Sequence, residues 1–290
     1  MPDLRLTPPA RASAQAGLVV IALTLKEQPT VPLEAESISP DAMSGLSHEA
    51  VRALPVFLGK RRRRLDDFFE VEGAGSDELA LRGDLSRVKW IGRAMTRGRI
   101  SIVGDVGMHL GASMTGGHIE VTGNVSDWLG AEMRGGVIRV RGNAGGQVGA
   151  AYRGGPRGMN QGTILVEGAA GIEVGMRMRR GVIAVKGPVR DFAGLQMKGG
   201  TIFLLGGAEI RTGAWMSRGT IVSLRPIPLL PTFTYACVYE PTFLRLYTRY
   251  LQALGFELPT AASDGSYQLY RGDTSGLGKG EILVWAARET

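Results

Sequence analysis

The residues best suited to acid–base or metal chemistry are few in this chain and stand far apart. They are three histidines and one cysteine, at His48, His109, His118 and Cys237. No histidine stands at metal-ligand spacing from another histidine or from Cys237, and a single cysteine excludes an internal disulfide. A lone cysteine is also typical of a reducing compartment. We therefore expect no metal site and no catalytic residue in this chain.

Acidic residues are more numerous, but their spacing does not bring them together. Pectin-cleaving enzymes built on a parallel β-helix typically use clustered aspartates beside a basic residue. In this chain the acids of the central repeat occupy unlike positions of the repeat, so one cluster is not expected; they are Asp105, Glu120, Asp127, Glu132, Glu167, Glu173 and Asp191. A polysaccharide-active enzyme remains an alternative only because such enzymes share the parallel β-helix fold.

Basic residues show one regular spacing. Arg134, Arg153, Arg179 and Lys198 each follow, by one residue, the position that most copies of the repeat fill with methionine. On consecutive stacked strands such cations lie about 5 Å apart and repel by up to about 1 kcal/mol per neighbour in water. An acidic partner or an acidic cofactor would relieve that repulsion, so this column is a candidate contact. The alternative is a solvated edge that discourages aggregation.

An insertion in the fourth copy is the second candidate contact. It lies within GGPRGMNQG, residues 154–162, and offers Arg157, Met159 and Asn160. Insertions in repeat proteins map to exposed loops, and loops often carry contacts. A further basic run, KRRRR at 60–64, resembles a nuclear signal in composition, but we expect a solvated loop or a partner contact.

These side chains are held by a repeat of nineteen residues from Gly83 to about Leu224. Unit starts at Gly104 and Gly123, and at Gly168 and Gly187, are nineteen residues apart, and seven copies are recognisable. A fixed short period means stacked units that bury their apolar faces against one another. In each copy β-branched residues alternate after a glycine, which predicts a strand. The column of Met95, Met114, Met133, Tyr152, Met178, Met197 and Met216 predicts inward packing at one corner.

This pattern predicts an all-β, right-handed parallel β-helix of about seven turns with small α/β caps. Glycine suits the corners because tight bends need positive φ, and the hand follows from the preference of parallel crossovers. We divide the chain into a disordered start at 1–16, an N-terminal cap at 17–82, the β-helix at 83–225 and a C-terminal α/β extension at 226–290. Within the flanks we expect a buried strand at 17–25, a helix near 47–54 and a helix over 241–254.

Composition limits the classes of partner. The formal net charge is +7, but aromatic residues make up only 7% and the basic residues are scattered, so we expect no nucleic-acid partner. The apolar run at 17–25 is shorter than the roughly 20 residues that span a bilayer, and no small-residue cleavage site follows it, so we expect no membrane contact.

Several segments closely resemble the family formed by the C subunits of formylmethanofuran dehydrogenase. Over roughly residues 20–225 the resemblance rests on LTLKEQPTVPLEAESISP at 23–40, LPVFLGKRRRRLDDFFEVEG at 54–73, GDVGMHLGASMTGGHIEV from 104, GNVSDWLGAEMRGG from 123 and VGAAYRGGPRGMNQGTILVEG from 148. The tail, RGDTSGLGKGEILV at 271–284, looks more like the bacterial branch, the C subunits of the formyltransferase/hydrolase complex of methylotrophs. The repeat alone is also similar to the carboxy-terminal domain of the glutamate synthase large subunit.

The resemblance implies a cytoplasmic, noncatalytic structural subunit of a hetero-oligomeric complex, with formyltransferase and amidohydrolase-like subunits as partners. In the bacterial branch that complex moves a formyl group from formyl-tetrahydromethanopterin to a methanofuran-type carrier and then releases formate. Archaeal relatives instead reduce carbon dioxide, and this remains the alternative. The resemblance implies no cofactor bound by this chain alone; methanofuran-type carrier and tetrahydromethanopterin belong to the complex.

Overall fold

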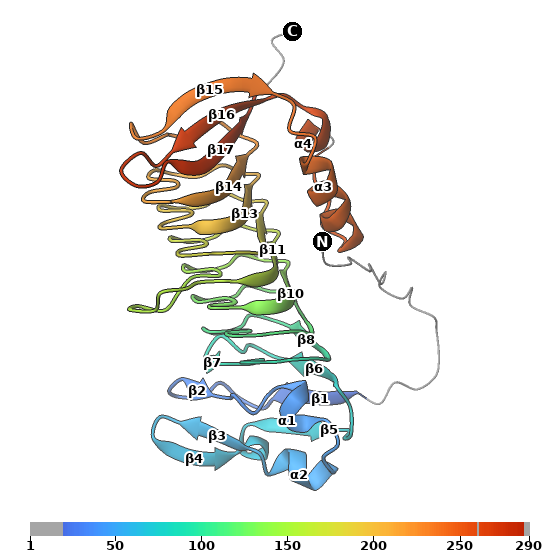
Figure 1. Ribbon diagram of the computed structural model, residues 1–290. Helices are drawn as coiled ribbons and strands as arrows, with labels where there is room; N and C mark the ends of the chain where they lie inside the picture. Colours follow the sequence, from blue (N-terminus) through green and yellow to red (C-terminus); the bar gives the residue numbers. More distant parts are fainter. Residues whose placement is uncertain (1–19, 260, 287–290) are drawn as a thin grey trace.

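The computed structural model describes residues 20–259 and 261–286, and strand is their main secondary structure (Figure 1). The predicted disordered segment, 1–16, lies outside the described residues. Most strands belong to one sheet of 13 strands in the order β15-β16-β17-β14-β13-β12-β11-β10-β9-β8-β6-β1-β5. The chain is therefore mostly β, as the alternating pattern predicts.

Each copy of the repeat contributes one strand, which pairs in parallel with the equivalent strand of the next copy. These strands are β8 (Arg99–Val103), β9 (His118–Val121), β10 (Arg134–Val140), β11 (Gln161–Val166), β12 (Val182–Val185), β13 (Lys198–Leu204) and β14 (Arg218–Ser223). β6 (Glu78–Arg82), just ahead of the first copy, pairs in parallel with β8. Ile119 lies opposite Ile138, and Ile138 opposite Ile164, and all three are fully buried. The predicted stacking of equivalent positions is thus confirmed at these strands.

A second line of parallel bridges joins the same copies at another position. It consists of Leu85, Val106, Val125, Ala144, Ala170, Val189 and Ala208. Each copy therefore pairs in parallel with its neighbours at two positions, once in the strand and once at this bridge. Tight packing explains the glycine pairs before the strands, because a Cβ on Gly136 would lie 2.6 Å from Cε of Met114.

The fourth copy corrects the predicted methionine column. Met159 occupies the column and is fully buried, whereas Tyr152 lies outside it. The Met159 N–H donates to Gly149 O at 2.8 Å, as that of Met133 donates to Gly130 O at 3.1 Å. A dry interior favours the adaptable thioether over a phenol that needs a polar partner. The insertion is therefore 152–158, ahead of the methionine; we call these residues the insertion loop.

The segment before the repeat closes the first end of the sheet. β1 (Ile21–Leu25), inside the predicted strand, pairs in parallel with β6 and antiparallel with β5 (Phe69–Glu72). The remaining elements here are β2 (Leu33–Glu34), α1 (Pro40–Met43), α2 (His48–Arg52), β3 (Pro55–Leu58), β4 (Arg61–Arg64) and the short helix η1 (Leu65–Asp67), and β7 (Val88–Lys89) follows in the first copy of the repeat. Strands β4, β3, β2 and β7 form a second, smaller sheet in that order.

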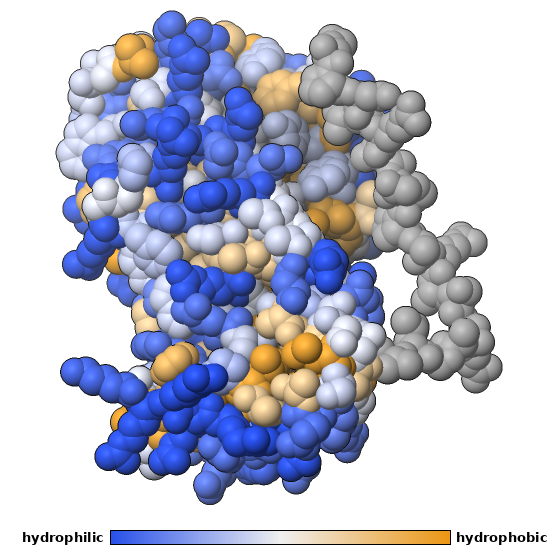
Figure 2. Space-filling view, turned by 60° about the horizontal axis from the view of Figure 1, so that its bottom comes forward, coloured by the Kyte–Doolittle hydropathy of each residue, from blue (hydrophilic) through white to orange (hydrophobic). Residues whose placement is uncertain are grey.

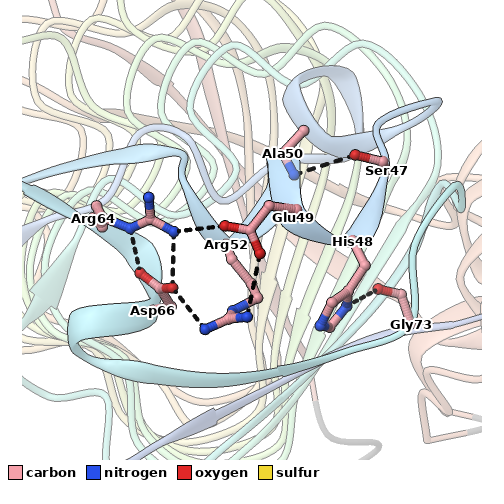
Figure 3. A network of polar contacts seen from close by, with 8 residues as sticks. All are labelled: Ser47, His48, Glu49, Ala50, Arg52, Arg64, Asp66 and Gly73. Carbon is pink, nitrogen blue, oxygen red and sulfur yellow. Dashed lines mark hydrogen bonds and ion pairs between the residues drawn. The ribbon is translucent and has the colours of Figure 1, made fainter.

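The basic run is a strand rather than the expected loop. All four arginines of β4 are exposed at the edge of the small sheet, and Figure 2, which brings this end forward, shows hydrophilic side chains crowding it. Arg64 binds Asp66 and Glu49, and Arg52 binds the same two acids (Figure 3). Hydrogen bonds from Arg64 lower the pKa of Asp66. Within the described residues Arg61–Arg63 form no ion pair, which is typical of an edge protected by charge.

The segment after the repeat extends the sheet and covers part of one face. β17 (Lys279–Trp285) pairs in parallel with β14, and β16 (Tyr267–Gly272) and β15 (Thr234–Tyr239) follow it in antiparallel order. α3 (Leu244–Ala253) lies alongside the later repeat strands, and α4 (Ala261–Asp264) follows it (Figure 1). Among the described helices, none has the length and apolar character needed to cross a bilayer.

Candidate functional site

The structure brings three of the predicted cationic positions together and separates the fourth. Backbone N–H groups of Asn160, Arg179 and Lys198 donate to the methionine carbonyls of the copies before them. Asn160 therefore stands in the column between Arg134 and Arg179, and Arg153 belongs to the insertion loop. The predicted run of four consecutive cations is wrong at its second position, because the insertion precedes the methionine.

The strand pairing adds two cations that the sequence analysis missed. At the start of neighbouring strands Lys198 lies opposite Arg218, and Arg218 lies opposite Lys279. None of the three forms an ion pair with another described residue, and all are exposed. The repeat pattern could not reveal Lys279, because this residue lies after the repeat and comes beside Arg218 only through the pairing of β17 with β14.

The insertion loop is hydrogen-bonded to Arg177 of the following copy. Arg177 Nη1 donates to Gly155 O at 2.6 Å, and the Gly158 N–H donates to Arg177 O at 2.9 Å. Arg153, Pro156 and Arg157 at its tip are exposed, whereas Asn160 beyond it is half-buried. Of the predicted contacts in this region, Met159 alone is fully buried and therefore inaccessible to a partner at this surface.

Beside the loop, four rings from four copies form an aromatic stack: Trp90, His109, Trp128 and Tyr152. Trp90 and His109 lie 4.0 Å apart at 8°, and Trp128 and Tyr152 lie 4.9 Å apart at 28°. Trp90, His109 and Trp128 have positive φ (66° to 68°), a conformation that points equivalent side chains along one line. No period-two or helical pattern signals this geometry, so the sequence analysis missed the stack.

The electrostatics of the stack favour neutral groups. Burial, helped by the charge of Lys89, lowers the pKa of His109 to about 4, and burial raises the pKa of Tyr152 above its usual value. The phenol is therefore protonated at neutral pH and can donate to Nδ1 of the neutral imidazole, 2.9 Å away. The Tyr152 hydroxyl and His109 Nδ1 therefore satisfy each other. This hydrogen bond anchors the start of the insertion loop and is not arranged as a catalytic acid–base pair.

On the other side of the loop the wall carries an open cationic groove of 580 Å³. Its lining residues are Gly154, Pro156, Arg177, Gln196, Lys198, Trp215 and Ser217. Arg177 Nε donates to Gln196 Oε1 at 2.7 Å, which fixes the guanidinium in the groove. Trp215 is 60% exposed as a residue, and its backbone N–H donates to Asp273 Oδ2 at 2.8 Å.

A second, apolar groove of 730 Å³ runs between α3 and the sheet. Glycines at the starts of the strands, such as Gly136 and Gly162, form its floor, and Leu246, Tyr247 and Tyr250 form its wall. The two tyrosine hydroxyls are already bonded to Thr201 and Thr163, at 3.0 and 2.8 Å. This groove offers packing surface and little polar chemistry.

The described residues hold no group of three or more histidine, cysteine or acidic side chains able to bind a metal ion. His118 lies half-buried on β9 and His48 lies exposed on α2, away from the stack. Several acids of the repeat are bound to cations, as in Glu120 with Arg141 and Glu167 with Arg139. What these residues can do chemically is bind and position acidic groups.

Comparison with known proteins places the chain among subunits of two related complexes. No protein-family model matches it. It is 45% identical over 83 residues, 28% of the chain, to the C subunit of molybdenum-containing formylmethanofuran dehydrogenase 1 of Methanothermobacter marburgensis. It is 38% identical over 74 residues, 26% of the chain, to the C subunit of the formyltransferase/hydrolase complex Fhc of Methylorubrum extorquens. The matched segments span only 21% and 28% of those two relatives.

A solved structure extends the similarity to nearly the whole chain. It is the crystal structure of the formyltransferase/hydrolase complex FhcABCD from Methylorubrum extorquens in complex with methylofuran. One of its chains is 35% identical, with a TM-score of 0.85, and the match covers 92% of this chain and all of that one. Both the fold and the length therefore agree with one protein of known assembly.

Proposed function

We propose a function from the premise that this chain belongs to the family of C subunits of the formyltransferase/hydrolase and formylmethanofuran dehydrogenase complexes. The chain is a noncatalytic structural component that binds formyltransferase and amidohydrolase-like subunits. The observation that carries this proposal is the match to a full-length chain of the Methylorubrum extorquens complex.

The architecture that suits this role is a right-handed parallel β-helix. Two lines of parallel pairing with a repeat of nineteen residues support it, and the right hand follows from the crossover rule. The predicted parts 17–82, 83–225 and 226–290 then act as cap, shaft and extension. Such a stack is stiff along its axis because each copy is hydrogen-bonded to the next.

Stiffness provides the mechanism of the subunit. A rigid shaft fixes the spacing of two active sites on its partners, so that a carrier can move between them at high effective concentration. We propose that the complex transfers a formyl group from formyl-tetrahydromethanopterin to a methanofuran-type carrier and hydrolyses the product to formate. The methylofuran named with the similar structure supports that carrier.

The surface for acidic groups is the second part of the proposal. Arg134, Arg179 and Lys198 of the column, with Arg153, Arg157 and Asn160 near the insertion, are the proposed contacts. Support comes from the exposed tip of the loop and from the like charges at the strand starts. Carbon dioxide reduction, the activity of the archaeal branch, is the second candidate, favoured by the 45% identity to a molybdenum-containing relative.

Purification of the complex tests the proposal. The chain, tagged and expressed in its native host, is expected to co-purify with both partner subunits, which mass spectrometry identifies. The whole complex is expected to release formate from the formylated carrier, and the isolated chain is expected to release none. Formate release by the isolated chain, or purification without either partner, would contradict the proposal. A molybdenum or tungsten pterin in the complex would select the dehydrogenase instead.

A further inference from the structure

The lining of the cationic groove is positively charged, and the buried carboxylate of Asp273 lies behind it, against the backbone N–H of Trp215. The lining contains Arg177 and Lys198 and no aspartate or glutamate. Lys198 Nζ and Arg177 Nη2 bind no other described residue, although Nε and Nη1 of Arg177 are occupied by Gln196 and Gly155. The groove therefore presents an unpaired ammonium group and a guanidinium whose direction is set by its two hydrogen bonds, which favours carboxylate ligands.

Trp215 gives the same groove an apolar anchor. The residue is 60% exposed, and no other described ring stacks on it. Its positive φ of 55° is unfavourable for a bulky residue, yet the conformation is held by the hydrogen bond to Asp273. Tryptophan and arginine are among the residue types most enriched at the hot spots of protein interfaces.

The dimensions of the groove suit a short stretch of extended polypeptide. It begins at the insertion loop and crosses Arg177, Gln196 and Trp215, which belong to three consecutive copies. Copies stacked at the strand spacing of about 4.8 Å give a length of roughly 10 to 15 Å, or three to four extended residues. Four of its lining residues, Gly154, Pro156, Lys198 and Trp215, are exposed. A small molecule would remain mostly in solvent there, whereas specific small-molecule sites enclose their ligands.

We infer that the cationic groove is the docking site for an acidic, extended segment of a partner subunit. Carboxylates of that segment bind Arg177 and Lys198, and an apolar side chain packs on Trp215. The inference rests on the proposed function, because it assumes partner subunits, and it identifies which surface receives one of them and by what chemistry.

The test uses the full chain co-expressed with the partner subunits of its complex. Trp215→Ala and Lys198→Glu are each expected to weaken the complex about tenfold or more, measured as the dissociation constant by biolayer interferometry. The loss with Lys198→Glu is expected to shrink at high salt, because salt screens exposed charges. Alanine is tolerated at this corner, since Ala94 adopts φ 53° at the equivalent position of the first copy. Arg82→Glu, an exposed charge reversal on β6, is the control and is expected to leave binding unchanged.

Cross-linking identifies the occupant. Cys237 is the one cysteine of the chain, so Ser217→Cys in a Cys237→Ala background places a single thiol in the groove. A photoreactive reagent on that thiol is expected to label a partner peptide rich in aspartate or glutamate. Labelling of peptides without acidic residues would overturn the inference, as would full affinity in both groove variants.

Two further outcomes separate the possible failures. If the wild-type complex assembles but tetraglutamate peptide binds the groove as tightly as the partner does, the groove is a site for small carboxylates and the inference fails alone. If the folded wild-type chain binds neither of the partner subunits, the proposed function fails and the inference fails with it.

Discussion

The aromatic stack and the cationic groove lie on either side of the insertion loop, yet their side chains are satisfied to very different degrees. Both use residues in the left-handed region, such as Trp128 at φ 66° and Trp215 at φ 55°. Trp128 is stacked between His109 and Tyr152, whereas Trp215 is 60% exposed. The left-handed conformation therefore supports a closed surface at the corner of Trp128 and an open one at the corner of Trp215, which is another position of the repeat.

The strand starts repeat this contrast in their charges. In the early copies Arg99 lies between Glu78 and His118, and its Nε is 3.9 Å from the Glu78 carboxylate. In the late copies Lys198, Arg218 and Lys279 follow one another. The two columns occupy different positions of the strands, because the column of Arg99 continues to Thr201 and Thr220, and the late cations lie two to three residues ahead of it. The cations without an ion pair are where a partner has most to offer.

The largest effect is expected from a change to the backbone stacking that both halves share. A Cβ on Gly135 would lie 2.0 Å from Thr115 O, and backbone atoms cannot yield as a flexible side chain can. We expect Gly135→Ala to lower the free energy of unfolding by about 3 kcal/mol or more, measured by urea denaturation. Gly154→Ala is the matched control: φ is +80° but no atom lies within 4 Å of the new Cβ. Its expected cost is about 1 kcal/mol, and equal costs at the two sites would show that the close approach is not limiting.

The next effect separates the two halves directly. Tyr152→Ala removes a ring that stacks on Trp128 and bonds His109, so we expect a loss of about 2 kcal/mol in the free energy of unfolding. Trp215→Ala removes a larger ring that contacts solvent, so the expected loss is within about 0.5 kcal/mol. Thermal and urea unfolding of both variants provide the measurement. A larger loss with Trp215→Ala than with Tyr152→Ala would reverse the assignment of closed and open surfaces.

Features set by residues close together in the sequence were predictable, and features set by residues far apart in the sequence were not. The strands around Ile119, Ile138 and Ile164 were predictable because period-two alternation and the copy spacing are local signals. Two tertiary facts were not local: Met159 rather than Tyr152 enters the interior, and Lys279 reaches Arg218 through a strand far along the chain. The predicted contacts stay predictions, and the structure corrects the register assumed for Arg153 and the exposure assumed for Met159.

The aromatic stack also predicts a pH dependence of intermediate size. The pKa of His109 is lowered to about 4 in the folded chain from an ordinary 6.5, so the unfolded chain binds a proton between these values while the folded chain does not. Stability is therefore expected to fall as pH decreases from about 6.5 to about 4. We expect roughly 1 kcal/mol, allowing for the solvent that reaches this half-buried ring. His109→Phe keeps an aromatic ring and is expected to lose this part of the pH dependence, measured as the difference between the two urea-unfolding profiles. Parallel profiles would mean that another group titrates.

The smallest expected effect has the opposite sign. Arg218 lies between two cations, so Arg218→Gln removes two repulsions and is expected to raise the free energy of unfolding by a few tenths of a kcal/mol at low ionic strength. Arg99→Gln, at the strand start of the early copies, removes an attraction to Glu78 and is expected to lower it by a similar amount. Both differences are expected to vanish in about 1 M salt, where screening acts over about 3 Å. A chain that would be more stable without Arg218 keeps that cation at a cost, which is expected of a residue retained for an acidic partner. If both variants changed the free energy of unfolding in the same direction, the charge contrast between early and late copies would be wrong.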